Sequence, residues 1–402
     1  MKRISLLLAA LWLLAVGPPV EAQQALLKHF ELTDVRSADD ASLKDLTLRA
    51  YGREFSLVLS PNEGLLSSLS GEHRAKIHRA DRFMKGRVAG IPGSWVRLNR
   101  ISGRLSGGIF DGTELYLVDS ARSFPEAMAT GASPDQTIVY RFADLELNTL
   151  IDHGGLTFQK KFERPVADYR SFVQHLQGIV AIKGAAMMAL PVTIVSDVQF
   201  TDEHGSDTAS VVAGRVNFVD GIYASQLGVG IQLLHHEILT NNDVLIETNA
   251  GDLLGGRFNN NTLVQPGFRQ FMRTGAGSNI PFGGLAHLFT GRNLDGSTVG
   301  VAYLGVLCSR SFGYGVNEDR SSDTSSALIF AHELGHNFNS PHDGERACAD
   351  ESFRGIMNSR LNGSQQFSNC SIDEMAQELA QAGCLVEVQD ASLLFTDSFE
   401  VD

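Results

Sequence analysis

The segment HELGHNFNSPHD, His332–Asp343, constrains the fold of this chain more than any other. His332 and His336 are four residues apart, so a helix would place both imidazoles on one face, one turn apart. His342 follows six residues later, and a continuous helix would carry it about 9 Å further along the axis and off that face. The helix must therefore end before His342. We expect Asn339 to make the reversal, because asparagine tolerates left-handed backbone better than most residues.

Three imidazoles gathered in this way can bind zinc at about 2.0–2.1 Å and leave a fourth position open for water. Glu333 follows His332, and its carboxylate can take the proton of that water as the water attacks a carbonyl carbon. Further along, a tight turn at Gly355–Asn358 (GIMN) would place Met357 under the metal as an apolar floor. The competing interpretation is a helix whose histidines are solvated or packed in a core. The third histidine at a suitable offset favours a catalytic zinc site.

The elements expected around this segment predict an α/β (α+β) domain with a mixed, mostly parallel sheet and an active-site helix. Apolar runs predict strands, and apolar residues at helical spacing predict helices. The expected strands are Pro191–Val195, Val229–Leu239 and Gly300–Leu307, and the expected helices are 207–226, Thr324–Asn337 with Asp323 as its cap, and Asp373–Ala382.

A chain of 402 residues is too long for one ordinary core, which predicts two domains. The first is expected to be β-rich, with strands at Glu54–Leu59, Ser94–Asn99 and Glu114–Val118. The expected division is a signal peptide (1–22), a propeptide-like domain (23–188), a catalytic domain (189–389) and an acidic C-terminal tail (390–402).

The first 22 residues resemble a secretory signal: Lys2 and Arg3 precede an apolar run, and cleavage is expected after Ala22. The apolar run is shorter than the roughly 20 residues that a membrane span needs, and no later segment is long and apolar enough. The protein is therefore expected to be secreted. A net charge of −13 argues against nucleic acid or an anionic membrane as its main partner, because both need clustered basic residues. The oligomeric state is left open.

Other candidate ligands carry less weight. His235, His236 and Glu237 fall in a predicted strand, where neighbouring side chains alternate between faces, so we expect a structural role for them. His204 and Asp202 lie in a polar stretch and are expected to be solvated. The four cysteines of this exported chain favour disulfides over a zinc–thiolate site, because no C-x-x-C pair is present.

Taken together, these motifs resemble the adamalysin/reprolysin branch of the metzincin zinc metallopeptidases. The resemblance covers most of residues 190–388, and a looser likeness to the propeptide of that family covers residues 54–119, notably Gly86–Phe110. The segments that carry the main resemblance are LPVTIVSD, AHLFTGRNLDGSTVGVAYLGVLC, HELGHNFNSPHD, GIMN and FSNCS, in family order.

The resemblance implies a zinc-dependent endopeptidase made as a zymogen-like precursor, acting on protein or peptide substrates. It implies that a substrate peptide lies antiparallel to an edge strand made of Gly300, Val301 and Ala302. It also implies two disulfides, Cys308–Cys384 and Cys348–Cys370.

This chain departs from the family pattern at several points. Asn339 replaces a glycine, no cysteine precedes Cys308 to block the zinc, and no Arg-x-Lys-Arg processing site precedes Leu190. Two calcium-ligand positions fall on Pro191 and Gly284, which have no side-chain oxygen, so calcium is not expected at the usual site. We expect latency by steric blockage; the alternative is a carboxylate such as Asp111 that reaches the zinc. The alternative functions are a non-proteolytic zinc-containing adhesion or toxin-like binding module, and a metal hydrolase acting on non-peptide amides.

Overall fold

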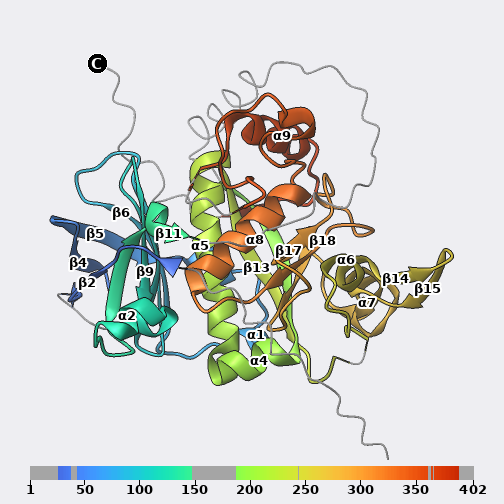
Figure 1. Cartoon of the computed structure of the whole chain (residues 1–402), viewed down its shortest axis with the longest axis horizontal. Helices are drawn as coiled ribbons and strands as arrows, with labels where there is room; N and C mark the ends of the chain where they lie inside the picture. The colour runs from blue at the N-terminus through green and yellow to red at the C-terminus, as the bar shows by residue number, and fades with distance from the viewer. Residues whose placement is uncertain are drawn as a thin grey trace, which may run out of the picture.

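A computed structural model describes residues 26–37, 43–146, 187–242, 244–360, 364 and 366–388. The described residues up to 146, here the N-terminal region, are built on a nine-stranded sheet, and those from 187 onward, the C-terminal region, on a six-stranded sheet covered by helices (Figure 1). The expected signal peptide and acidic tail lie outside the described residues, and the expected domain division stays a prediction. In the ranges described, no helix is long and apolar enough to cross a membrane.

The N-terminal sheet is antiparallel throughout, in the order β2-β10-β9-β8-β7-β6-β5-β4-β3. Its strands are β2 (Glu31–Leu32), β3 (Arg36–Ser37), β4 (Asp45–Ala50), β5 (Arg53–Pro61), β6 (Arg82–Val88), β7 (Trp95–Ile101), β8 (Arg104–Phe110), β9 (Leu115–Ser120) and β10 (Thr137–Arg141). A separate pair, β1 (Leu26–Leu27) and β11 (Leu145–Glu146), and two short helices, α1 (Gly71–Arg74) and α2 (Pro125–Ala129), complete it. The three strands predicted from sequence lie within β5, β7 and β9 to within one residue.

Strand β5 has one buried and one exposed face, because successive side chains of a strand point to opposite sides: Phe55 and Leu57 are buried and Glu54 and Ser56 are exposed. Strand β7 is buried on both faces. Val96 and Leu98 belong to the core of the N-terminal region itself. The opposite face of β7 packs against a helix of the C-terminal region. The central strands of this sheet therefore lie between two cores.

The C-terminal sheet is mixed and mostly parallel, as expected. Its order is β13-β12-β16-β18-β17, with β19 paired antiparallel to β12. The pairings of β12 with β13, β12 with β16 and β16 with β18 are parallel, and β17 runs antiparallel to β18 at one edge. The strands are β12 (Met187–Ser196), β13 (Val229–Ile238), β16 (Leu285–Thr290), β17 (Gly300–Ala302), β18 (Tyr314–Glu318) and β19 (Val386–Val388).

Helices cover this sheet, and the longest is central to the molecule (Figure 1). They are α4 (Val198–His204), α5 (Thr208–Leu227), α6 (Ala250–Gly255), α7 (Phe268–Thr274), α8 (Asp323–Asn337) and α9 (Asn369–Leu379), with a small hairpin of β14 (Arg257–Asn259) and β15 (Thr262–Gln265). The single-turn 3-10 helices are η1 (Glu63–Leu66), η2 (Ala121–Ser123), η3 (Phe142–Asp144), η4 (Gly205–Asp207), η5 (Ala276–Asn279) and η6 (Arg346–Cys348).

Predicted boundaries were wrong at β12, which begins at Met187 and not at Pro191, and at β17, α8 and α9. The strand expected over 300–307 ends at Ala302, because the next residues turn towards the end of α8, where Gly305 N donates to His336 O and Val306 N to Asn337 O. The cap of α8 is Ser322, whose Oγ accepts from Ser325 N at 3.1 Å, and not Asp323. Helix α9 begins earlier than expected because Ser368 caps it, and it ends at Leu379, before the expected Ala382.

Helix α5 is buried almost all round, since β13 packs on one side of it and β7 of the N-terminal region on the other. Two glycines make the second contact possible. A Cβ at Gly221 would lie 2.6 Å from Arg97 Cγ, and one at Gly214 would lie 3.0 Å from Asn99 Nδ2. The two regions consequently share one continuous hydrophobic core.

Buried polar contacts also join the two regions. Asp220 on α5 accepts hydrogen bonds from Arg97 Nε at 2.9 Å, from Asn62 Nδ2 at 3.0 Å and from Ile231 N at 3.0 Å. At the first turn of α8, Asp119 accepts from Thr324 Oγ1 at 2.6 Å. A carboxylate at that end of a helix is favoured by the helix dipole.

Candidate metal centre

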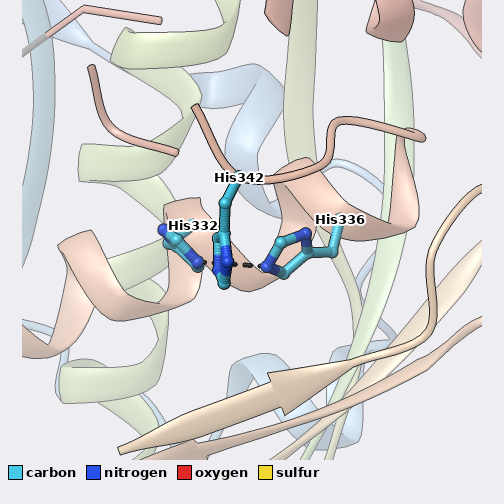
Figure 2. Close-up of side chains that lie close together, drawn as sticks. All are labelled: His332, His336 and His342. Carbon is cyan, nitrogen blue, oxygen red and sulfur yellow. Dashed lines mark hydrogen bonds between the residues drawn. The ribbon is translucent and has the colours of Figure 1, made fainter. Parts of the chain in front are cut away.

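Helix α8 brings His332 and His336 to one face, with their Nε2 atoms 3.1 Å apart (Figure 2). Each ring is oriented through its other nitrogen. His332 Nδ1 donates to Ile356 O and His336 Nδ1 donates to Ser340 O, both at 2.8 Å. With Nδ1 protonated, each neutral ring directs the lone pair of Nε2 towards the other ring. Two lone pairs that face each other in this way call for a cation between them.

His342 completes the group from the chain that follows α8 (Figure 2). Its ring centroid lies 5.3 Å from that of His332 and 4.8 Å from that of His336. The side chain is buried, and among the described residues no hydrogen-bond partner reaches its Nε2 atom. The ligand atoms of the three histidines lie within 4.8 Å of one another. This donor set suits zinc, which takes neutral imidazole nitrogens.

Burial is the main reason why these histidines are neutral. It lowers the pKa of His332 well below its usual value, and the neighbouring His336 and His342 lower it further. Burial also lowers the pKa of His336 to about 3 and lowers the pKa of His342. Protons therefore do not compete for the three nitrogens at neutral pH.

The reversal before His342 has the expected backbone. Asn339 has a φ angle of 80°, in the left-handed region. Its N–H donates to His336 O, and the N–H of Ser340 donates to Gly335 O, both at 2.9 Å, which closes the end of the helix. The Nδ2 atom of Asn339 donates to Glu374 Oε2 at 3.0 Å, so the side chain is held by α9.

We expect Asn339→Gly to keep zinc affinity within about twofold and Asn339→Val to weaken it at least about tenfold. A β-branched residue at positive φ is strained, at about 1–2 kcal/mol or more, and that strain would displace His342. Competition with a chromogenic chelator measures the affinity, and the melting temperature serves as the folding control. Wild-type zinc affinity in the valine variant would contradict this account of the turn.

Met357 lies directly under α8. It is fully buried, and a Cβ at Gly335 would clash with its Sδ atom. The turn that carries it is held by Asp343, a residue for which the sequence analysis predicted no role in this turn. Asp343 N donates to Met357 O at 2.9 Å, and Asp343 Oδ2 accepts from Gly355 N at 2.6 Å. Asp343 is thus hydrogen-bonded to this turn. Its position directly after His342 was the sequence feature that could have indicated a role near the metal.

Glu333 is fully buried and lies against the edge strand β17. A Cβ at Gly300 would lie 2.5 Å from Glu333 Oε1, so only glycine leaves room for the carboxylate there. Because Gly300, Val301 and Ala302 form the last strand of the sheet order, the carboxylate lies between the histidine helix and the sheet edge.

A second residue that the sequence analysis missed fixes the segment after β17. Asn337 Nδ2, at the end of α8, donates to Tyr303 O at 2.8 Å. Its Oδ1 lies 2.8 Å from Nε2 of the buried His287. The position of Asn337 next to His336 was the sequence feature that could have indicated a role for it. Its hydrogen-bond partners could not be predicted, because they are more than 30 residues away.

Two disulfides frame the centre, in the pairing that the resemblance implied: Cys308–Cys384 and Cys348–Cys370. His204 was expected to be solvated, but its Nε2 pairs at 2.7 Å with Asp319, whose side chain is 6% exposed. Pro191 lies in β12 and Gly284 precedes β16, and the expected absence of the usual calcium site stays a prediction.

Comparison with known proteins decides the family of this region. Residues 188–369 match the family model described as Metallo-peptidase family M12, of the Reprolysin_5 type. This stretch contains the three histidines, Glu333 and Met357. It is a reprolysin-type metallopeptidase domain.

Three relatives agree with this assignment. Human disintegrin and metalloproteinase domain-containing protein 9 is 32% identical over 48% of this chain. The bovine and human disintegrin and metalloproteinase domain-containing protein 10 are 24% and 23% identical, each over 90% of this chain. The matched parts span 23% of the first relative and 55% of each of the other two. In the two relatives named protein 10, the match therefore covers the N-terminal region of this chain as well as its reprolysin-type domain.

Proposed function

We propose that this protein is a zinc-dependent endopeptidase whose metal is held by His332, His336 and His342. The observation that carries the proposal is the orientation of the three rings. Two Nδ1 atoms donate to main-chain carbonyls, and the buried Nε2 atoms converge. Zinc bound there would polarise the substrate carbonyl and acidify its water ligand, whose pKa falls to about 7 in such sites.

Glu333 would act as the general base and then as the proton carrier. Glu333 follows His332 on α8, but its carboxylate lies against β17. The carboxylate is therefore next to the three histidine ligands and is not itself one of the ligands. There it can accept the proton of the attacking water and deliver it to the leaving amine.

The edge strand β17 would bind the substrate. It is paired on one side with β18, in antiparallel register from Gly300↔Asn317 to Ala302↔Gly315. An extended peptide can add to the other side of an edge strand through main-chain hydrogen bonds. Such a peptide would run past Glu333 at Gly300, which favours hydrolysis within a chain over hydrolysis of small amides.

We also propose export and a zymogen-like precursor. The N-terminal region is matched along with the reprolysin-type domain in two relatives that cover 90% of the chain. Its hydrogen bonds to the C-terminal region include those to Asp220 on α5, Gln232 on β13 and Thr324 at the start of α8. Inhibition by steric blockage stays a prediction.

Zinc removal tests the proposed activity. The exported chain, before and after limited proteolysis, is assayed on casein with and without a zinc chelator. We expect hydrolysis that falls at least about a hundredfold on chelation and returns with micromolar zinc, because the metal supplies both carbonyl polarisation and the reactive water. Stoichiometric zinc without hydrolysis of casein would favour the binding-module alternative, and hydrolysis of acyl amides alone would favour the non-peptide hydrolase.

A further inference from the structure

A second group of possible metal ligands lies between the two regions, outside the reprolysin-type centre. It consists of His73, His235 and Glu237, whose ligand atoms lie within 4.8 Å of one another. The sequence analysis expected no shared site in this part of β13, because neighbouring strand residues point to opposite faces. That alternation does not separate residues two apart. His236 points away and bonds Ser196, whereas His235 and Glu237 share a face, with Nε2 and Oε2 3.0 Å apart.

His73 reaches this face from α1 of the N-terminal region. Its ring centroid lies 4.1 Å from that of His235, with the two planes tilted by 55°. The Nδ1 atom of His73 lies 2.8 Å from Ser70 Oγ, the hydroxyl at the cap of α1. A hydrogen bond at one ring nitrogen leaves the other for a metal, as in most histidine–metal sites.

The two elements that supply these ligands are held together by other contacts. Ser67 Oγ donates to Gln232 Oε1 at 3.0 Å, and Gln232 Nε2 donates to Ser68 Oγ at 2.9 Å. Gln232 lies on β13, and both serines lie just before α1. The position of His73 over His235 is therefore built into the docking of the two regions, and it does not depend on the histidines themselves.

We propose that His73, His235 and Glu237 bind one divalent transition-metal ion of the zinc class at the junction of the two regions. Two imidazoles and one carboxylate are ligands that zinc and its neighbours prefer, whereas calcium and magnesium prefer oxygen ligands alone. Water would fill the fourth position. Because one ligand comes from the N-terminal region and two from β13, the ion binds only when the regions are docked. Its binding therefore stabilises the docked state.

Metal content of the full chain tests this proposal. The parent carries Glu333→Gln to prevent self-cleavage, and zinc is counted by mass spectrometry after equilibration in micromolar buffered zinc. We expect two zinc ions per chain in the parent and one in both His73→Gln and Glu237→Gln. The matched control is His78→Gln, which removes another histidine at the same junction, where His78 Nε2 lies 3.1 Å from Ser206 O. It should keep two.

The two metal sites are separated by a second set of variants. With His332→Ala and His336→Ala, we expect one zinc per chain and a rise of several degrees in melting temperature on adding zinc, both lost on adding Glu237→Gln. One zinc in the parent that survives His73→Gln but not His336→Ala would overturn the junction site. One zinc that is lost in His73→Gln alone would support the junction site and contradict the proposed catalytic zinc. Circular dichroism of every variant shows that lost metal does not reflect lost folding.

Discussion

Glu333→Gln is expected to lower kcat/KM for a peptide substrate by about 10²- to 10⁴-fold while zinc content stays at the wild-type level. Glutamine keeps the size of the side chain, so it fits the space that Gly300 leaves beside β17. It cannot accept a proton, so the attacking water loses its base. The three histidine ligands are untouched. Activity and zinc are measured on the same preparation of the chain.

The control for this prediction is Glu203→Gln, the same chemical change at an exposed position on α4. It should leave both activity and zinc unchanged. Full activity of the Glu333 variant with stoichiometric zinc would show that the proton is taken by another group. Loss of zinc together with activity would show that Glu333 supports the ligands and is not only a base.

Arg97→Ala is expected to lower the free energy of unfolding by about 3–5 kcal/mol, the usual range when one partner of a buried ion pair is removed. Arg97 is 1% exposed and Asp220 is 5% exposed. Without the guanidinium, the carboxylate of Asp220 would remain buried with only Asn62 and the main chain of Ile231 to bond it. Chemical denaturation of the full chain, with the Glu333→Gln background to prevent self-cleavage, measures the change.

Arg104→Ala is the matched control for this second prediction. Arg104 also crosses between the regions, to Asp207 at 3.1 Å, but its side chain is 30% exposed. Exposed pairs contribute about 0–1 kcal/mol, so this variant should lose no more than that. Equal losses in the two variants would show that burial does not decide the contribution of Arg97. A loss below about 1 kcal/mol in both would show that the two regions do not depend on their polar junction.

Local features of the fold and of the metal centre were predictable from the amino-acid order. Helical geometry alone places His332 and His336 on one face, and the distance to His342 forces a reversal at Asn339, which has the expected positive φ. The strand predicted at Glu54–Leu59 likewise lies within β5. These predictions succeed because each depends on residues within one or two turns, where backbone geometry leaves few choices.

Other features were decided only when distant segments packed together. Helix α5 is buried all round because β7 and β13 lie on opposite sides of it, and its own sequence does not indicate which strands those are. The end of β17 and the role of Asp343 in the Met357 turn likewise depend on hydrogen bonds between residues that come together only after the chain reverses.

The proposed metal ligands at the junction of the two regions, His73, His235 and Glu237, show most clearly what sequence patterns cannot predict. His73 lies 162 positions before His235 and belongs to the N-terminal region, whereas His235 lies on β13 of the C-terminal region. No spacing rule connects the two residues, and only the docking of the regions places their ring centroids 4.1 Å apart. Periodicity and spacing describe what neighbouring residues can do together. Contacts between residues far apart in the chain depend on how whole surfaces fit, and that fit is set by the packing of the shared core.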